Sequence, residues 1–176
     1  MVAGEGAIFE VENPSDESVV ATVQGLSLAQ VQAAIASSRK AWDGTDWSTL
    51  PRAQRTALVR RFASELEARS DRFRELAVLE AGCPVSSGVM GAQVATPIRH
   101  AFDACDLYLQ LPEIEENPLP MHERIGMMGG PVQSIRRWIP YGVCTAIAAY
   151  NVPLFTALWK VVPALLTGNT VILRPN

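Results

Sequence analysis

The stretch "AAYNVPLF" places a single asparagine, Asn151, between a run of small apolar residues and a proline. The NH2 group of an asparagine side chain is a hydrogen-bond donor, and a donor fixed in place can stabilise an oxygen atom that gains negative charge during a reaction. Asparagine also favours the N-cap of a helix, and residue type alone favours that role here. The two roles are compatible, because a capping position fixes where the side chain begins.

Three cysteines are the other residues with reactive side chains, and their number and spacing do not match a metal site. Cys105 falls on the apolar face of a predicted helix and Cys144 inside a predicted buried strand, so both are expected to be inert. Cys83 follows a glycine in a predicted turn and is expected to be the most exposed. No histidine or other base lies near it in the sequence, so none of the three is predicted to be a nucleophile, and no metal ligand is predicted.

Residues 141–176 contain the elements that would position Asn151. "GVCTAIAA" is a near-continuous apolar run, typical of a parallel strand covered on both faces. "VPLFTALWKVVPALLTG" predicts a helix that ends at Gly168 in a left-handed conformation, and "TVILRP" predicts a second buried strand. Together these segments predict a strand–helix–strand (βαβ) unit.

The ends of these two strands predict a common ligand site. In an open parallel sheet, ligands bind beyond the carboxyl ends of the strands. Tyr150 and Asn151 follow the first strand and Arg174 ends the second, so all three are expected to face the same crevice. Two strands with open edges cannot bury their own apolar faces, so we expect the unit to be the front portion of a larger doubly wound domain.

The preceding residues predict a strand pair followed by helices. "AIFEVENP" and "VVATV" predict two short strands, and Ser27 with Gln30 predicts a capping box at the start of a helix. Gly82 is expected to end a third helix, and Thr96-Pro97 to cap and begin a fourth. The stripes expected to be buried are Leu28, Val31, Ile35 and Trp42 on the first helix and Leu58, Val59, Phe62 and Leu66 on the second.

Two segments between the last of these helices and the βαβ unit are rich in proline and glycine. "LPEIEENPLPMHE", residues 111–123, is acidic and is expected to be an exposed linker or the start of an irregular extension. "RIGMMGGPVQSIRRWIP", residues 124–140, has Gly-Gly-Pro between two short apolar–polar segments and predicts a hairpin.

Composition excludes several classes of function. The chain has 176 residues, 48% hydrophobic and 19% charged, which describes a globular protein. Its net charge of −3 gives no electrostatic footprint for nucleic acid or for an anionic membrane. No run is long and apolar enough to span a bilayer, and the N-terminus does not have the pattern of a secretory signal. A reduced, cytoplasmic protein is therefore expected.

The segment "IPYGVCTAIAAYNVPLFTALWKVVPALLTGNTVILRPN" resembles the aldehyde dehydrogenase superfamily. Members of this family typically read Pro-x-Gly-Val, an apolar strand, Pro-Trp-Asn-x-Pro, a helix with an internal lysine and Pro-Ala-Leu, then Gly-Asn, an apolar strand and Lys-Pro. The upstream segments "NPSDESVVATV" and "LPRAQRTALVRRFASELEARSDRFRELAVLEAGCP" also follow the family's N-terminal pattern. The resemblance therefore covers nearly the whole chain.

The resemblance implies oxidation of an aldehyde to a carboxylic acid, with NAD or NADP as cofactor, through a cysteine thiohemiacetal and thioester. Asn151 matches the family asparagine whose side chain, with a backbone N–H, forms the oxyanion hole. Ile147, Ala148 and Tyr150, together with Asn151, match strand-end positions that line the nicotinamide and ribose. Arg174 matches the lysine that binds the adenosine ribose.

The sequence departs from the family pattern in two places and keeps the pattern's helix lysine. Ala149-Tyr150 replaces the usual Pro-Trp, which alters the cofactor or substrate wall but keeps Asn151 in register. Arg174 replaces lysine, and a guanidinium fork differs from an ammonium point charge, so the choice between NAD and NADP stays open. Lys160 matches the internal helix lysine, for which a proton or water network and a solvent-reaching stem are both open interpretations.

The resemblance thus implies an α/β protein: the N-terminal part of the aldehyde dehydrogenase fold, with an incomplete doubly wound (Rossmann-like) cofactor domain. Residues 1–120 would flank the cofactor domain, 121–140 would form an oligomerisation hairpin, and 141–176 the first βαβ unit. The family's nucleophilic cysteine and general-base glutamate match no residue here, so the chain alone is expected to be inactive.

The alternatives are a truncated, non-catalytic interaction module and, for the residues before 120, an independent helical bundle. The expected partners are a small aldehyde and, in a full-length protein, further copies in a dimer or tetramer.

Overall fold

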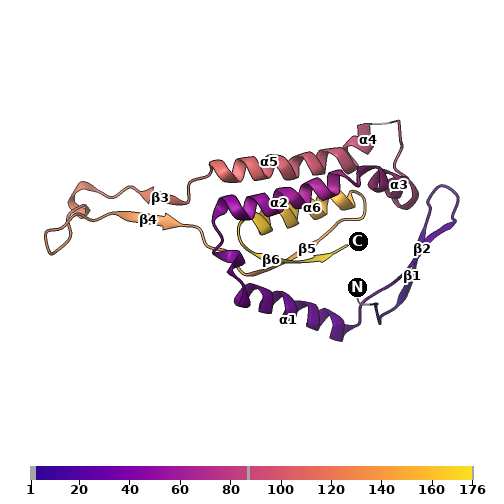
Figure 1. Ribbon diagram of the computed structural model, residues 1–176, viewed down its shortest axis with the longest axis horizontal. Coiled ribbons are helices and arrows are strands. Elements are labelled where there is room, and N and C mark those ends of the chain that lie inside the picture. The colour runs from indigo at the N-terminus through magenta and orange to yellow at the C-terminus, as the bar shows by residue number, and fades with distance from the viewer. Residues whose placement is uncertain (1–2, 87, 176) are drawn as a thin grey trace.

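The computed structural model describes residues 3–86 and 88–175. Within these residues the strands form three two-stranded sheets, and helices pack against the parallel one (Figure 1). The strands are β1 (Ile8–Glu12), β2 (Val19–Gln24), β3 (Ile114–Asn117), β4 (Ser134–Arg137), β5 (Val143–Ile147) and β6 (Thr170–Arg174). The helices are α1 (Leu28–Gly44), α2 (Arg52–Glu67), α3 (Ser70–Ala81), α4 (Gly88–Met90), α5 (Thr96–Gln110) and α6 (Pro153–Leu166).

The parallel pair β5–β6 and the crossover helix α6 confirm the predicted βαβ unit. The register runs from Val143 opposite Thr170 to Ile147 opposite Arg174. Gly168 follows α6 with a φ of +88°, a conformation that glycine adopts without the steric cost of a Cβ. The prediction that both faces of β5 are covered is wrong for this structure, because Ala146 is buried whereas Thr145 and Ile147, on the other face, are exposed.

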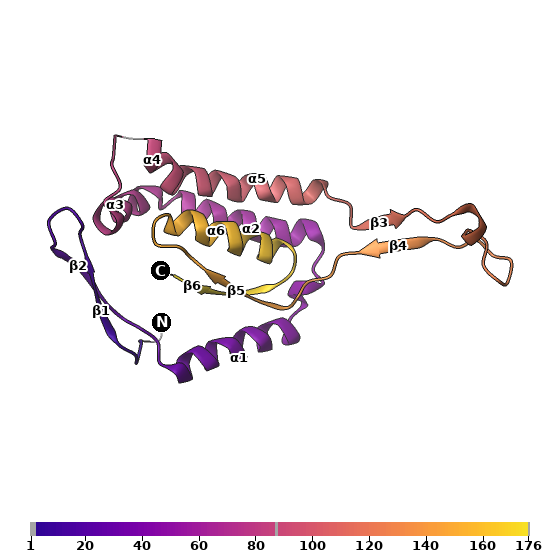
Figure 2. The same cartoon turned by 180° about the vertical axis from the view of Figure 1, so that it is seen from behind.

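The hydrophobic core lies among α2, α5 and α6, which stack side by side over one face of β5–β6 (Figures 1 and 2). Burial of these apolar side chains is the main force that holds α6, and therefore the turn before it, in place. The core residues of these three helices are Val59, Ala63, Ile98, Ala101, Cys105, Leu158, Val162 and Leu166.

Arg55 connects this helical layer to the loop before α2. Its side chain is only 6% exposed, yet every nitrogen of the guanidinium has a partner. Nε donates to the carbonyl of Leu166 at 2.7 Å, Nη1 to the carbonyl of Leu50 at 2.9 Å, and Nη2 to the Tyr108 hydroxyl at 2.8 Å. A buried cation is tolerated only with such partners, so Arg55 fixes the end of α6 against α2 and α5.

Local signals at two helix ends are confirmed. Ser27 caps α1, and its hydroxyl and the Gln30 side chain form the reciprocal capping box. Gly82 ends α3 in the left-handed conformation, with a φ of +59°. The N–H of Cys83 then donates to the carbonyl of Ala77 at 3.0 Å, which is the longer bond of a Schellman motif.

The expected burial of the α1 stripe is wrong over the first half of the helix. Leu28 is 74% exposed, and Val31 and Ile35 are exposed as well. The helix contacts the sheet near its C-terminal end, where Trp42 is half-buried and its indole N–H donates to the carbonyl of Gly168 at 3.3 Å. Hydrophobic periodicity correctly identifies the apolar face, but among the described residues only the C-terminal half of that face is covered.

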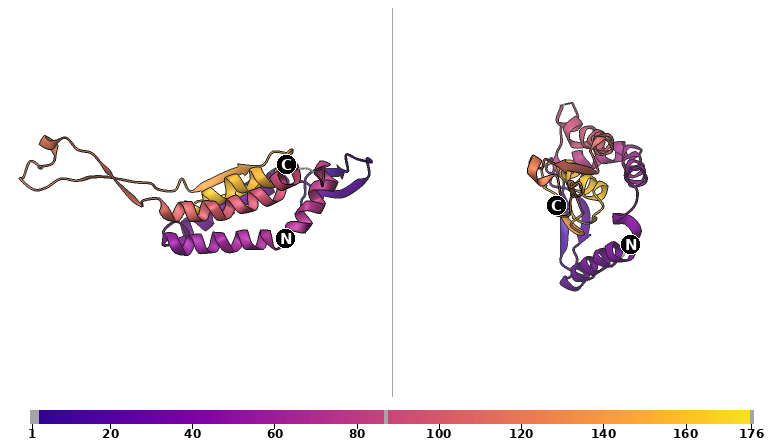
Figure 3. Two further views of the ribbon diagram at one scale, coloured as in Figure 1. Left: turned by 90° about the horizontal axis from the view of Figure 1, so that it is seen from above. Right: turned by 90° about the vertical axis from the view of Figure 1, so that its left-hand side faces the viewer.

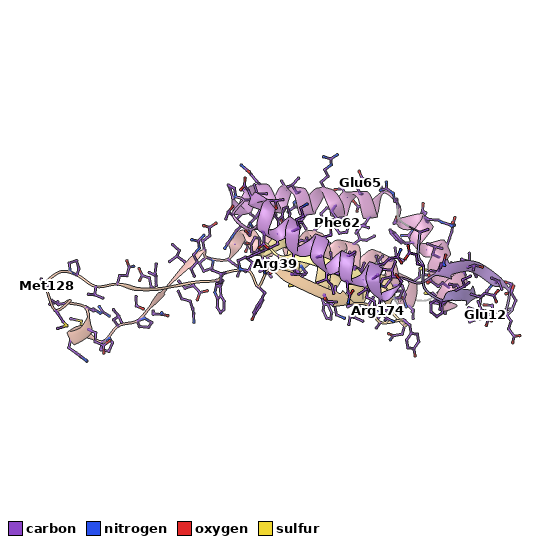
Figure 4. The ribbon with its side chains drawn as sticks, turned by 90° about the horizontal axis from the view of Figure 1, so that it is seen from below. Glu12, Arg39, Phe62, Glu65, Met128 and Arg174 are labelled. Atoms are coloured by element: carbon purple, nitrogen blue, oxygen red, sulfur yellow. The ribbon has the colours of Figure 1, made fainter. Side chains whose placement is uncertain are left out.

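The buried face of α2 is rotated from the predicted one. Val59 and Ala63 are buried with Thr56, whereas Leu58 and Phe62 are exposed (Figure 4). Arg55, Val59 and Ala63 are spaced four residues apart, so the buried guanidinium and the two buried apolar side chains share one face of α2.

A π-helical segment, Gly91–Ala95, joins α4 to α5, so the expected cap at Thr96 is wrong. Thr96 is already inside a continuous helix, and its N–H donates to the carbonyl of Gly91, five residues before it. Pro97 lacks an N–H, and in a regular α-helix its ring would clash with the carbonyl of Gln93. The wider π turn gives a physical reason why the helix continues through this proline.

The arm formed by residues 114–137 projects from one end of the molecule (Figures 1 and 3). Strands β3 and β4 pair from Ile114 opposite Arg137 to Asn117 opposite Ser134. Residues 111–123, expected to be a linker or the start of an irregular extension, therefore contain a strand that belongs to the arm. Toward the tip, the region around Gly-Gly-Pro is held by an isolated bridge between Ile125 and Pro131.

The remaining antiparallel pair, β1–β2, lies at the opposite end of the molecule from the arm (Figures 1 and 2). It confirms the two strands expected near the N-terminus. No helix in residues 3–86 and 88–175 has the length and apolar character needed to cross a bilayer.

Candidate functional site

The carboxyl ends of β5 and β6 bring the predicted site residues to one edge of the sheet. Ile147 and Arg174 are partners in the register, and the N–H of Ala148 donates to the carbonyl of Arg174 at 3.0 Å. Tyr150 and Asn151 follow in the turn that leads into α6. The predicted juxtaposition of these five residues is therefore present in the structure.

The Asn151 side chain does not cap α6. The N-cap position of that helix belongs to Val152, and no side chain makes a capping hydrogen bond there. Asn151 is exposed, and within the described residues its carboxamide makes no hydrogen bond. The NH2 group is thus free to donate to a ligand, which is the requirement of the alternative role as a fixed donor.

The backbone of the turn is held although the Asn151 side chain is free. Ala149 donates its N–H to Oγ1 of Thr156 at 2.8 Å, and the same hydroxyl donates to the carbonyl of Val152 at 3.0 Å. Pro153 occupies the first position of α6, where its missing N–H and fixed φ suit a helix start. Ala149 and Val152 are thereby both tied to Thr156 in the first turn of the helix.

Gln93 holds the same turn from the other side. Its side chain is 5% exposed, and Nε2 donates to the backbone carbonyl of Asn151 at 2.7 Å. The two residues are 58 positions apart, so this bond joins the π-helical segment to the β5–α6 turn. The Gln93 Oε1 atom is buried and has no hydrogen-bond partner among the described residues.

The remaining predicted cofactor residues differ in exposure. Ala148 is buried, whereas Ile147 is 52% and Tyr150 80% exposed. Arg174 is exposed at the end of β6, and in the described part of the chain it forms no ion pair (Figure 4). The edge therefore exposes an apolar, an aromatic and a cationic side chain.

Lys160 reaches the same edge from the second turn of α6. Its Nζ atom donates to the backbone carbonyl of Ile147. The lysine is exposed, so its ammonium group touches the strand end while it stays accessible to water. This position agrees with the solvent-reaching interpretation and also places a proton donor beside the site.

An apolar pocket of about 250 Å³ borders the strand ends on the side of α3 and α6. Leu154 and Ala157 of α6 and Leu173 of β6 line it, and Gln93 forms part of its wall. The Gln93 carboxamide is thus surrounded mostly by apolar side chains.

The three cysteines do not offer a nucleophile at this edge. Cys83 is only 4% exposed, so the expectation that it is the most exposed cysteine is wrong: the Schellman motif folds the chain back and turns its side chain into the core. Cys105 is fully buried, and burial raises the pKa of its thiol, which disfavours the thiolate. Cys144 is half-buried within β5.

Sequence reasoning missed Gln93, Thr156 and Arg55. Proline four residues after Gln93 in a helical pattern was a signal for a distorted turn, and it was available in "GAQVATP". Thr156, near the start of a predicted helix, was a recognisable partner for the preceding turn. Arg55 had no such signal, because its partners lie on three other segments.

Comparisons with known proteins show the family of this chain. The family model described as the aldehyde dehydrogenase family matches residues 1–176. The chain belongs to the aldehyde dehydrogenase family. The resemblance inferred from the strand–helix–strand motif is therefore confirmed.

Solved aldehyde dehydrogenases show the same fold over their N-terminal part. An indole-3-acetaldehyde dehydrogenase is 31% identical to this chain, with a TM-score of 0.84. The match covers 100% of this chain and 38% of the indole-3-acetaldehyde dehydrogenase chain. The P. syringae indole-3-acetaldehyde dehydrogenase in complex with NAD+ and IAA is also 31% identical, with 33% of its chain covered and a TM-score of 0.84. For the NADP complex of a glyceraldehyde-3-phosphate dehydrogenase from Bacillus halodurans the identity is 26%, the TM-score 0.83, and the covered shares 99% and 35%. The chain spans about a third of the length of the structures it matches.

Proposed function

We propose that residues 1–176 form the N-terminal part of an NAD(P)-dependent aldehyde dehydrogenase, which oxidises an aldehyde to a carboxylic acid. The observation that carries this proposal is the free carboxamide of Asn151 on a fixed turn at the carboxyl end of β5. Family membership supports the reaction class. The complexes of similar proteins with NAD+ and NADP support the cofactor class.

The residues at the strand ends fit a nicotinamide dinucleotide. Ile147 and Tyr150 offer exposed apolar and aromatic surface for a ring and a ribose, and Ala148 adds no side-chain bulk beside the turn. Arg174 offers an exposed cation that makes no ion pair within residues 3–86 and 88–175, suited to a ribose hydroxyl or to a phosphate. When bound, the cofactor supplies the hydride acceptor.

The role proposed for Asn151 is to stabilise the oxyanion. Attack on an aldehyde places negative charge on the former carbonyl oxygen, and a donor aimed at that oxygen stabilises the transition state by roughly 2.7–4 kcal/mol. The bonds at Ala149 and at the carbonyl of Asn151 fix the backbone that carries this donor. Preorganisation is what makes such a donor effective, because little reorientation is then needed during the reaction.

We further propose that residues 1–176 do not catalyse the reaction alone. The family mechanism needs a thiolate nucleophile, but Cys83 and Cys105 are buried and Cys144 lies inside a strand. The complete polypeptide would contribute the nucleophile and the general base.

The test is aldehyde-dependent formation of NAD(P)H, followed by ultraviolet absorbance. A dehydrogenase polypeptide that contains this chain should form NAD(P)H, and residues 1–176 alone should not. Turnover by residues 1–176 alone would refute the proposed division of roles, and no turnover by the complete polypeptide with a panel of aldehydes would refute the function itself.

The arm is proposed to assemble subunits. Met128 lies at the tip of the arm (Figure 4) and, like Met127, is fully exposed. Trp138, Ile139 and Tyr141, which follow β4, are largely exposed. Apolar side chains gathered on a projecting segment are typical of an interaction surface. Size-exclusion chromatography with light scattering should show an oligomer for the complete polypeptide, and a monomer after Met127 and Met128 are both changed to Glu.

A further inference from the structure

We propose that Gln93 is a positioning residue for the oxyanion donor: its carboxamide, delivered by the π-helical segment, fixes the backbone of Asn151 and so aims the Asn151 side chain. This inference rests on the proposed role of Asn151. Gln93 does not reach the reacting atoms itself and acts through Asn151.

The contact is well formed and enclosed. Gln93 Nε2 lies 2.7 Å from the Asn151 carbonyl oxygen, and the Gln93 side chain is 5% exposed. A short bond in an apolar wall is stronger than the same bond in water, because competing solvent is excluded. Within the described residues, this is the one hydrogen bond that involves Asn151 and a side chain.

The carbonyl group of the Gln93 side chain makes no hydrogen bond within residues 3–86 and 88–175. Its Oε1 atom is buried without a hydrogen-bond partner, which costs free energy that an apolar side chain of the same length would avoid. Val94, Leu154 and Leu173 line the adjoining pocket, so a methionine at position 93 would suit the surroundings. The NH2 group therefore accounts for an amide at position 93, because this group donates a hydrogen bond to the turn that carries Asn151.

The π-helical segment fixes the backbone position from which the Gln93 side chain extends. It packs against α3, α5 and α6. The Thr96-to-Gly91 bond and Pro97 define the wide turn, and Gln93 lies in the middle of it. Single π turns inside α-helices occur frequently at functional sites, which agrees with this position.

Loss of this support would leave the turn attached to α6 but free on its other side. Ala149 and Val152 keep their bonds to Thr156, so the turn remains, while the peptide of Asn151 can tilt. A displacement of about 1 Å at a catalytic group can lower the rate on the order of 100-fold. We therefore expect a roughly 10- to 100-fold loss in kcat for Gln93→Met, with little change in cofactor affinity.

The test uses the complete dehydrogenase polypeptide that contains this chain, with Gln93→Met, Asn151→Ala and a matched control. Thr56→Val is the control, because Thr56 is buried and its Oγ1 also lacks a partner in the described chain, but it lies on α2. The measurements are kcat at saturating aldehyde, the Kd for NAD and NADP, and the Tm. Gln93→Met should lose kcat while Thr56→Val keeps it, at similar Tm.

The variant Gln93→Glu tests the hydrogen bond through the pH dependence of kcat, which can be measured even if the variant is less stable than the wild type. A carboxylate cannot donate to the Asn151 carbonyl, whereas the protonated acid can. Burial raises the pKa of such a carboxyl, so the donor is present at low pH and is lost as the pH rises through that pKa. The ratio of Gln93→Glu to wild-type kcat should therefore rise as the pH is lowered, and a ratio that does not change with pH would overturn the inference.

The outcomes separate the two proposals. If Asn151→Ala lowers kcat but Gln93→Met behaves like Thr56→Val, the positioning role is wrong and the proposed function stands. If Asn151→Ala leaves kcat unchanged, the oxyanion role is wrong and the inference about Gln93 is overturned with it. A parallel loss in both variants, with cofactor Kd preserved, supports both.

Discussion

Replacement of Asn151 by alanine separates the two roles that this residue could have. If the side chain capped α6, its loss would cost about 1 kcal/mol of stability. The structure places Val152 at the cap and gives the carboxamide no hydrogen bond within the described residues, so the expected change in stability is that of an exposed position, within about 0.5 kcal/mol. The expected loss in kcat is roughly 100- to 1,000-fold, because one oxyanion donor is removed.

The assay for this prediction uses the complete polypeptide and one further variant. Asn151→Asp keeps a good capping residue but replaces the donor by an acceptor, so it should lose at least as much kcat as Asn151→Ala while its Tm stays near that of wild type. Thermal unfolding, kcat and the cofactor Kd are measured on each protein. The reasoning is refuted if Asn151→Ala lowers the Tm as a lost cap would and Asn151→Asp restores both Tm and turnover.

Further perturbations test other parts of the structure. Arg174→Ala should weaken NAD or NADP binding about 10- to 100-fold with kcat unchanged, since it removes one hydrogen bond from a charged donor; fluorescence titration that gives an unaltered Kd would contradict the proposed contact. Arg55→Met should lower the free energy of unfolding by about 2–6 kcal/mol, because the carbonyls of Leu50 and Leu166 each lose a partner at about 1–3 kcal/mol; the exposed Arg72→Met is the control, with an expected loss below about 1 kcal/mol. Hydrogen bonds from Trp138 and Arg136 hold the pKa of Glu115 below its ordinary value of 4.5. The contribution of these bonds to the stability of the arm is therefore complete above pH 4.5 and is lost as the pH falls through the lowered pKa. Tryptophan fluorescence should show this transition, and Glu115→Gln should remove it.

Features set by neighbouring residues could be predicted from the sequence. The capping box at Ser27, the left-handed Gly82 and Gly168, and the βαβ unit depend on contacts within one or two elements. For the same reason the strand ends could be expected to share an edge. These predictions needed no knowledge of what packs against the elements.

Features set by distant contacts were not predictable. The apolar stripe from Leu28 to Ile35 is visible in the sequence, but periodicity does not say what covers it. Strand β3 was missed because four residues that include two glutamates lack an apolar alternation, and their pairing with β4 depends on a segment 17 or more residues away. Cys83 was misjudged because a local turn was read without the backward fold that buries its side chain.

The hydrogen bond from Gln93 to the Asn151 carbonyl is another feature that could not be predicted from the sequence. It joins residues 58 positions apart through one side-chain donor, and no hydrophobic pattern reports such a bond. The candidate site residues could be proposed from the resemblance, but the groups that hold their backbone in place required the coordinates.

The pairing of Ile114 with Arg137 closes the arm where it leaves the body. The polypeptide returns to the core beside the point of departure, so the tip can lengthen, shorten or change its chemistry without shifting the register of β5 or the turn at Asn151. Under the proposed role of the arm in subunit assembly, quaternary structure could change without altering the turn that carries Asn151.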